Sequence, residues 1–135
     1  MRVDAKRNEG GEEMTLGQAL ETTDELKANH YSEEVKIRWV NDLESLLYYE
    51  LIYWHEDAPA EAPEPYTAQD MERELMVPDP YSDVYLKYLY AQIDFHNAEF
   101  SRYNNSAMLY NTALTTYADW YNRNHAPKQP AVIRA

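Results

Sequence analysis

Apolar residues recur at helical spacing along most of this chain, most clearly between Ser32 and His55. One apolar residue recurs every three or four positions in this stretch: Val40, Leu43, Leu47, Leu51 and Trp54. Trp39 and Leu46 widen this apolar stripe. This spacing is typical of an amphipathic helix. Ser32 is a favourable N-cap, and Glu33 and Glu34 suit the positive end of a helix dipole. The pattern therefore predicts one long helix over 32–55.

Two further helices are predicted by caps and by apolar density. The first spans 15–28, where Thr15 and Gln18 have the spacing of a capping box. The second begins at Tyr81 or Ser82 and runs to Tyr103, with Ser82 as its expected N-cap. Its first half, residues 84–95, has almost no polar face. A helix that is apolar nearly all round is buried on several sides, so we expect this half to be central or covered by a neighbouring subunit.

A fourth helix is predicted over 106–124. Asn104 and Asn105 favour a tight corner before it, and Pro127 lies just beyond it. Its apolar stripe consists of Ala107, Tyr110, Leu114, Tyr117 and Tyr121, flanked by Leu109, Ala113 and Trp120.

Prolines separate the second helix from the third. Pro59, Pro63 and Pro65 favour an extended loop over 56–66. A short helical turn is expected within 67–73, and 74–77 is expected to be extended. The prediction is an all-α protein, a small bundle of about four mostly antiparallel helices with a long proline-rich loop between helices two and three. Its parts are a flexible N-terminal extension (1–13), a helical domain (14–126) and an extended tail (127–135).

Composition narrows the possible functions. The net charge of −12 argues against tight binding to nucleic acid or to an anionic membrane, which requires basic surface. The chain has no cysteine, so it has neither a disulfide framework nor a thiolate metal site. It has no apolar run of the length a membrane span needs. Thirteen tyrosines and three tryptophans are present; tyrosine is enriched at protein interfaces, although it also fills cores and their rims.

Catalytic and metal-binding motifs are missing from the sequence. None of the four histidines completes Glu-x-x-His or His-Glu-x-x-His. The chain has no Gly-x-Ser-x-Gly elbow and too few glycines for a phosphate-binding loop. Asp94, His96 and Glu99 form one conceivable metal group, although a polar pair on a helix is the commoner outcome of such spacing. The sequence thus predicts no catalytic residues, no cofactor and no metal site.

One pattern extends over roughly 14–128. It is most evident in 74–81, 85–89, 91–95, Glu99, 102–106 and 121–123, with looser matches at 36–39 and 42–44. In this pattern the chain resembles the small helical head-tail connector, or adaptor, proteins of tailed bacteriophages and prophages. The sequence departs from the family pattern in the polar extension before Met14 and in the Ala/Pro/Glu-rich loop at 57–65.

The resemblance implies a structural virion protein at the neck of the particle, made in the cytoplasm of the bacterial host. Such proteins form a ring, usually of twelve copies, under the portal protein. The ring prolongs the DNA channel, through which DNA passes without specific binding, and joins the head to a downstream neck or tail protein. The resemblance implies no enzymatic activity.

A ring subunit needs apolar surface beyond its own core, and the aromatic residues are the candidates for it. The predicted subunit or partner interface comprises Tyr85, Tyr88, Tyr110, Tyr117 and Trp120, with Pro78, Tyr81, Lys128 and Arg134. The 56–80 segment is expected to reach a neighbour, and the weakly basic tail to extend onto the portal. The alternative is a monomeric or dimeric helical module, regulator-like or antitoxin-like, that binds one protein partner. A third hypothesis is a helical metalloenzyme that uses Asp94, His96 and Glu99.

Overall fold

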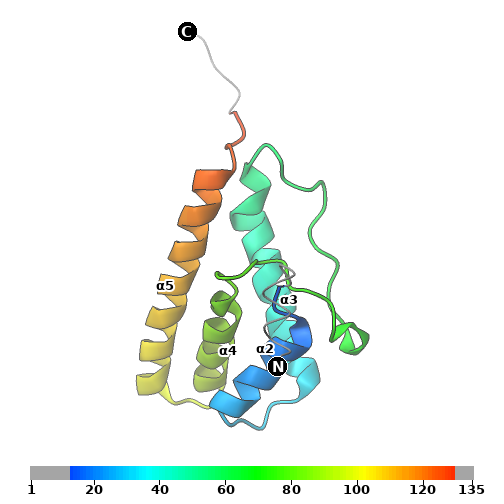
Figure 1. The fold of residues 1–135 in the computed structure, drawn as a ribbon. Coiled ribbons are helices and arrows are strands. Elements are labelled where there is room, and N and C mark those ends of the chain that lie inside the picture. Colours follow the sequence, from blue (N-terminus) through cyan, green and yellow to red (C-terminus); the bar gives the residue numbers. More distant parts are fainter. Residues whose placement is uncertain (1–12, 130–135) are drawn as a thin grey trace.

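Four α-helices make up the fold in the computed structural model, which describes residues 13–129 (Figure 1). The helices are α2 (Leu16–Leu26), α3 (Glu33–Glu50), α4 (Asp83–His96) and α5 (Phe100–Asn124), and the 3-10 turns η1 (Ile52–Trp54) and η2 (Ala68–Asp70) lie between α3 and α4. Within the described range, β-pairing is confined to two isolated bridges, Thr15–Glu74 and His55–Pro127. The predicted all-α bundle of four helices is confirmed. Of the extension predicted over 1–13, residues 1–12 lie outside the described residues.

The helix α4 is the central element. It packs against α5 on one side and against α2 and α3 on the other (Figure 1). Val84, Tyr85 and Leu89 of α4 are fully buried, as the apolar character of this segment predicted. The outer helix α5 buries Ser106, Tyr117 and Tyr121 and leaves most of its other residues partly or fully exposed.

Two of the three expected N-caps are formed by side chains. The Thr15 hydroxyl accepts the Gln18 amide, and the Gln18 side chain accepts the Thr15 amide. The Ser32 hydroxyl accepts the Val35 amide. Ser82 precedes α4 but makes no such bond, because its buried hydroxyl donates to Asp79 instead.

The corner before α5 lies earlier than the sequence predicted. Helix α4 ends at His96, and Ala98 takes a left-handed conformation with φ 59°. Asn104 and Asn105, expected at the corner, are exposed residues inside α5. Their side chains disfavour a helix interior only weakly, and continuing α5 from Phe100 adds a full turn that contacts α4.

The long segment between α3 and α4 is held to the bundle by two side chains of α3, one turn apart. Asn41 bonds both backbone groups of Tyr66, accepting its amide at 2.8 Å and donating to its carbonyl at 3.1 Å. Glu44 Oε2 accepts hydrogen bonds from the hydroxyls of Tyr66 (2.7 Å) and Tyr85 (2.6 Å) and from the Met76 amide (3.0 Å). These bonds fix residues 66–77 over α3, and Pro78 and Tyr81 follow from that anchored segment.

Candidate interaction site

An apolar pocket of about 430 Å³ lies where the end of α3, the proline-rich loop and the last turns of α5 meet. Its walls are aromatic rings, prolines and aliphatic side chains, with Glu61 and His125 as polar members: Tyr48, Ile52, Pro59, Glu61, Pro63, Met76, Pro78, Tyr117, Trp120, Tyr121 and His125. We call it the Trp120 pocket. Apolar concave sites with few polar groups are the usual form of a binding site.

Stacked rings build one wall of the Trp120 pocket. Tyr117, Trp120 and Tyr121 are spaced at three and four along α5, so they share one face of the helix. Tyr81 stacks on Trp120 with ring centroids 4.9 Å apart, and Trp120 stacks on Tyr117 at 6.1 Å. The turn that presents Tyr81 is closed by a bond from its amide to the Pro78 carbonyl.

Two histidines tie the end of α5 to the end of α3 beside this wall. Buried His55 faces the Leu51 carbonyl through Nδ1 at 2.9 Å and the Asn122 side chain through Nε2 at 2.7 Å. His125 stacks on Tyr121 at 3.8 Å and bonds Asp57 at 2.7 Å. This bond from His125 is the main reason that the pKa of Asp57 lies below its usual 3.8.

The tyrosines around the pocket are neutral. Burial raises the pKa of Tyr121, and raises that of Tyr117 further. These rings therefore present apolar faces and hydroxyl donors over the physiological pH range. The arrangement is suited to binding an apolar or aromatic side chain.

The structure brings four of the predicted interface residues together: Pro78, Tyr81, Tyr117 and Trp120. Tyr117 is only 1% exposed, so it belongs to the core and leaves almost no surface for a partner. Tyr88 and Tyr110 form a separate half-buried pair between α4 and α5, with centroids 5.2 Å apart. Burial raises the pKa of Tyr110 to about 12.

Tyr85 is the clearest correction to the predicted interface. It is 0% exposed, and its hydroxyl bonds Glu44 and the Val77 amide inside the bundle. A side chain with no accessible surface cannot contact a partner of the folded chain, so Tyr85 belongs to the core of one subunit. Sequence spacing could not show this, because core and interface aromatics follow the same helical period.

The tail prediction is only partly within the described residues. Lys128 is exposed, places its Nζ 3.6 Å from the Tyr53 ring centroid and bonds the Trp54 carbonyl through its amide. Arg134 lies outside the described residues. The bridge between His55 and Pro127 runs the start of the tail along the end of α3.

Two exposed apolar patches were not among the predicted interface residues. The α3-end patch consists of Leu46, Tyr49, Tyr53 and Trp54, and the corner patch consists of Phe95 and Phe100 with half-buried Tyr103 beside them. Leu46 and Trp54 belong to the apolar stripe that the sequence predicts for the long helix, yet both are exposed. The chain leaves α-helical geometry at Leu51, which turns Trp54 outward, where its indole donates to the Tyr49 carbonyl.

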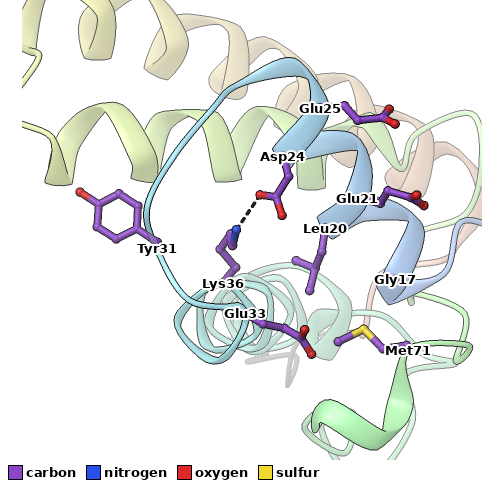
Figure 2. Close-up of a pocket in the computed structure, with 9 residues that line it drawn as sticks. All are labelled: Gly17, Leu20, Glu21, Asp24, Glu25, Tyr31, Glu33, Lys36 and Met71. Carbon is purple, nitrogen blue, oxygen red and sulfur yellow. Dashed lines mark hydrogen bonds and ion pairs between the residues drawn. The ribbon is translucent and has the colours of Figure 1, made fainter.

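A second depression, of about 590 Å³, is acidic (Figure 2). It lies between α2 and the start of α3, and its polar lining is mainly carboxylates: Glu21, Asp24, Glu25 and Glu33. Lys36, the one cation among the lining residues, is bound to Asp24 at 2.6 Å (Figure 2). The remaining carboxylates give this face a negative potential.

The conceivable metal group is not assembled. Asp94 is buried and pairs with Lys27 at 2.9 Å, whereas the His96 ring stacks on Trp39 at 5.3 Å. Glu99 pairs with Arg102. Across residues 13–129, no three His, Cys, Asp or Glu side chains are grouped closely enough to hold a metal ion.

Comparison with protein-family models finds no match, and comparisons with curated proteins and with solved structures also find none. No helix among the described residues has both the length and the apolar character needed to cross a membrane.

Proposed function

We propose that this chain is a structural subunit of a tailed phage particle. Copies of it form a ring under the portal protein, and the ring extends the DNA channel and joins the head to a downstream neck or tail protein. The observation that carries this proposal is the pair of unlike apolar patches on one small subunit. The resemblance of the sequence to head-tail connectors supplies the biological setting.

The two patches lie at opposite ends of the bundle. The end of α3 is at one extremity and the turn between α4 and α5 at the other (Figure 1). Trp54 and Phe100 are 57% and 58% exposed, although Trp54 has the Tyr53 ring at 5.0 Å and Phe100 has the Phe95 ring at 6.4 Å between centroids. Exposed apolar clusters on a small protein usually mark protein–protein contacts. Head-to-tail association needs two different surfaces on each copy, and such contacts close into a ring when the rotation allows.

The negative net charge supports the part of the proposal in which DNA passes through the ring. The chain has a formal net charge of −12, and the acidic depression of Figure 2 adds a local concentration of carboxylates. DNA binds proteins mainly through cations placed on phosphates. A channel through which DNA must pass should repel the phosphate backbone rather than hold it, and this subunit has the required sign.

Co-assembly with the portal protein encoded in the same genome tests the proposal. Purified chain is mixed with assembled portal and imaged by cryo-electron microscopy, with unassembled portal monomer as the control. A ring density on the narrow end of the portal is the expected result. Absence of binding to assembled portal at micromolar concentrations would refute it.

The Trp120 pocket favours one alternative, a monomeric or dimeric module that binds one segment of a single protein partner. Sedimentation of the chain with the proteins encoded by neighbouring genes distinguishes the module from the connector. A discrete one-to-one complex with a toxin or a transcription factor supports the module, and a ring on the portal supports the connector.

A further inference from the structure

We propose that the Trp120 pocket of one copy receives the C-terminal segment 130–135 of the next copy. The inference rests on the proposed ring and names the contact that links its subunits. It is drawn from the contents of the pocket, from the residues of the segment, and from the direction in which the chain leaves the bundle.

The segment matches the pocket in chemistry. Residues 130–135 read Pro-Ala-Val-Ile-Arg-Ala, three adjacent aliphatic residues followed by a cation. The pocket offers aromatic and proline walls for the aliphatic side chains. The loop 56–64, which contributes Pro59, Glu61 and Pro63 to the lining, has four acidic residues and no Lys or Arg. Arg134 is therefore complementary in charge to this loop, and Val132 and Ile133 to the walls.

The direction of the chain favours a neighbouring copy over its own pocket. The Ala126 carbonyl accepts the Glu56 amide and the Lys128 amide donates to the Trp54 carbonyl, so 126–128 runs along the end of α3. Pro127 and Pro130 each bias the preceding residue toward extended backbone. In Figure 1 the chain from 125 to 129 continues past the end of α5, away from the bundle.

The segment also has reach: six residues beyond Gln129 span about 20 Å when fully extended. An extended arm adds contact area without changing the packing of either bundle. It also makes the contact directional, since one copy gives the arm and the next copy gives the pocket.

Cysteine cross-linking tests this contact cleanly, because the chain has no cysteine of its own. A full-length chain with Glu61→Cys is mixed with a mass-tagged chain with Ile133→Cys, under mild oxidation at assembly concentrations. A disulfide between the tagged and untagged chains is expected. Gln69→Cys, exposed on η2 and not among the pocket-lining residues, replaces Glu61→Cys in the matched control and is expected to give at least tenfold less product.

The double variant Glu61→Cys with Ile133→Cys identifies the other possible occupant. If the double variant forms a disulfide only within one chain, while the mixed single variants give no product, the segment occupies the pocket of its own chain and the inference is wrong. If neither experiment gives a disulfide, or the segment binds only the portal, the inference is also wrong.

Charge reversal supplies a second readout. Glu61→Arg and Arg134→Glu should each lower the association constant of the full-length chain at least threefold, and their combination should restore part of the loss. Ring formation on the portal is followed in the same samples. If rings form on the portal but no cross-link is found, this contact is refuted and the proposed function still holds. If the unaltered chain does not bind the portal, the proposed function itself is refuted.

Discussion

A single buried carboxylate, Glu44, organises much of the described chain. It is 3% exposed and accepts three hydrogen bonds, from two tyrosines and one backbone amide. An unpaired buried carboxylate would be costly, and here the donors replace the water that it loses. Burial, followed by the charge of Glu44, raises the pKa of both Tyr66 and Tyr85, so both hydroxyls keep their protons and act as donors to Glu44.

Tyr85→Phe should therefore destabilise the protein by about 1–3 kcal/mol, because it removes a donor from Glu44 and leaves the buried Val77 amide without its acceptor. The measurement is the free energy of unfolding in urea. Tyr49→Phe is the matched control, since Tyr49 is exposed at 55% and should change stability by less than about 0.5 kcal/mol. Equal effects of the two substitutions would contradict the role assigned to Glu44.

Asp24 provides a pH-dependent contact between α2 and α3. Burial acts to raise its pKa, but hydrogen bonds from Lys36 and Asn29 outweigh burial and hold the pKa below 3.8. A depressed carboxyl pKa stabilises the folded state above the unfolded value, and this stabilisation is lost as the pH falls through the folded value. We expect Asp24→Asn to lower the urea midpoint at pH 6 and to matter progressively less below about pH 4. A stability difference that is constant from pH 6 to pH 3 would rule out this linkage.

At the scale of elements, the helices were predictable and their junctions were not. Caps and periodicity located α2, α3 and the first half of α4 because each signal is local, as with Thr15 and Gln18. The turn at Ala98 carries no glycine or asparagine at its left-handed residue, so composition pointed to Asn104 and Asn105 instead. What decides the turn is the antiparallel packing of α5 against α4, a tertiary effect that overrides weak propensities.

Substitution by glycine distinguishes the corner observed at Ala98 from the corner predicted at 104–105. Ala98→Gly should stabilise the protein by roughly 1 kcal/mol, since glycine takes a positive φ without the steric cost that alanine pays. Ala118→Gly, inside α5, should destabilise it by about the same amount. Both are read from urea unfolding. A corner at 104–105 would place Ala98 within a helix, and Ala98→Gly would then be destabilising.

At the scale of the whole molecule, the sequence predicted an aromatic interaction site but not the full set of residues that form it. Tyrosine excess and the 78–81 turn pointed to Pro78, Tyr81 and Trp120, which do meet. The pocket that Pro78 and Trp120 form with Pro59 and Pro63 depends on how the proline-rich loop folds back over α3. The loop is bonded to α3 by the Tyr48 hydroxyl at the Pro59 carbonyl, and the segment after it by Asn41 and Glu44. The long-range partners of these side chains leave no periodic signal in the sequence.

Self-association should depend on the corner patch without affecting the fold. Phe100→Ser removes an exposed ring at the α4–α5 turn, and we expect it to weaken assembly at least tenfold, as loss of an aromatic anchor does at other interfaces. Its free energy of unfolding should change by less than about 0.5 kcal/mol, because an exposed side chain contributes little to the core. Mass photometry of the assembled chain, with urea unfolding of the dilute chain, measures the two quantities separately.

Leu26→Ser is the control for this substitution. Leu26 is 69% exposed at the end of α2 and belongs to neither patch, so its loss removes a comparable apolar surface without touching the proposed contact. If both substitutions weaken assembly equally, association reflects general apolar exposure. If neither does, the corner patch is not a subunit contact. Loss confined to Phe100→Ser ties assembly to one end of the bundle, as a directional ring contact requires.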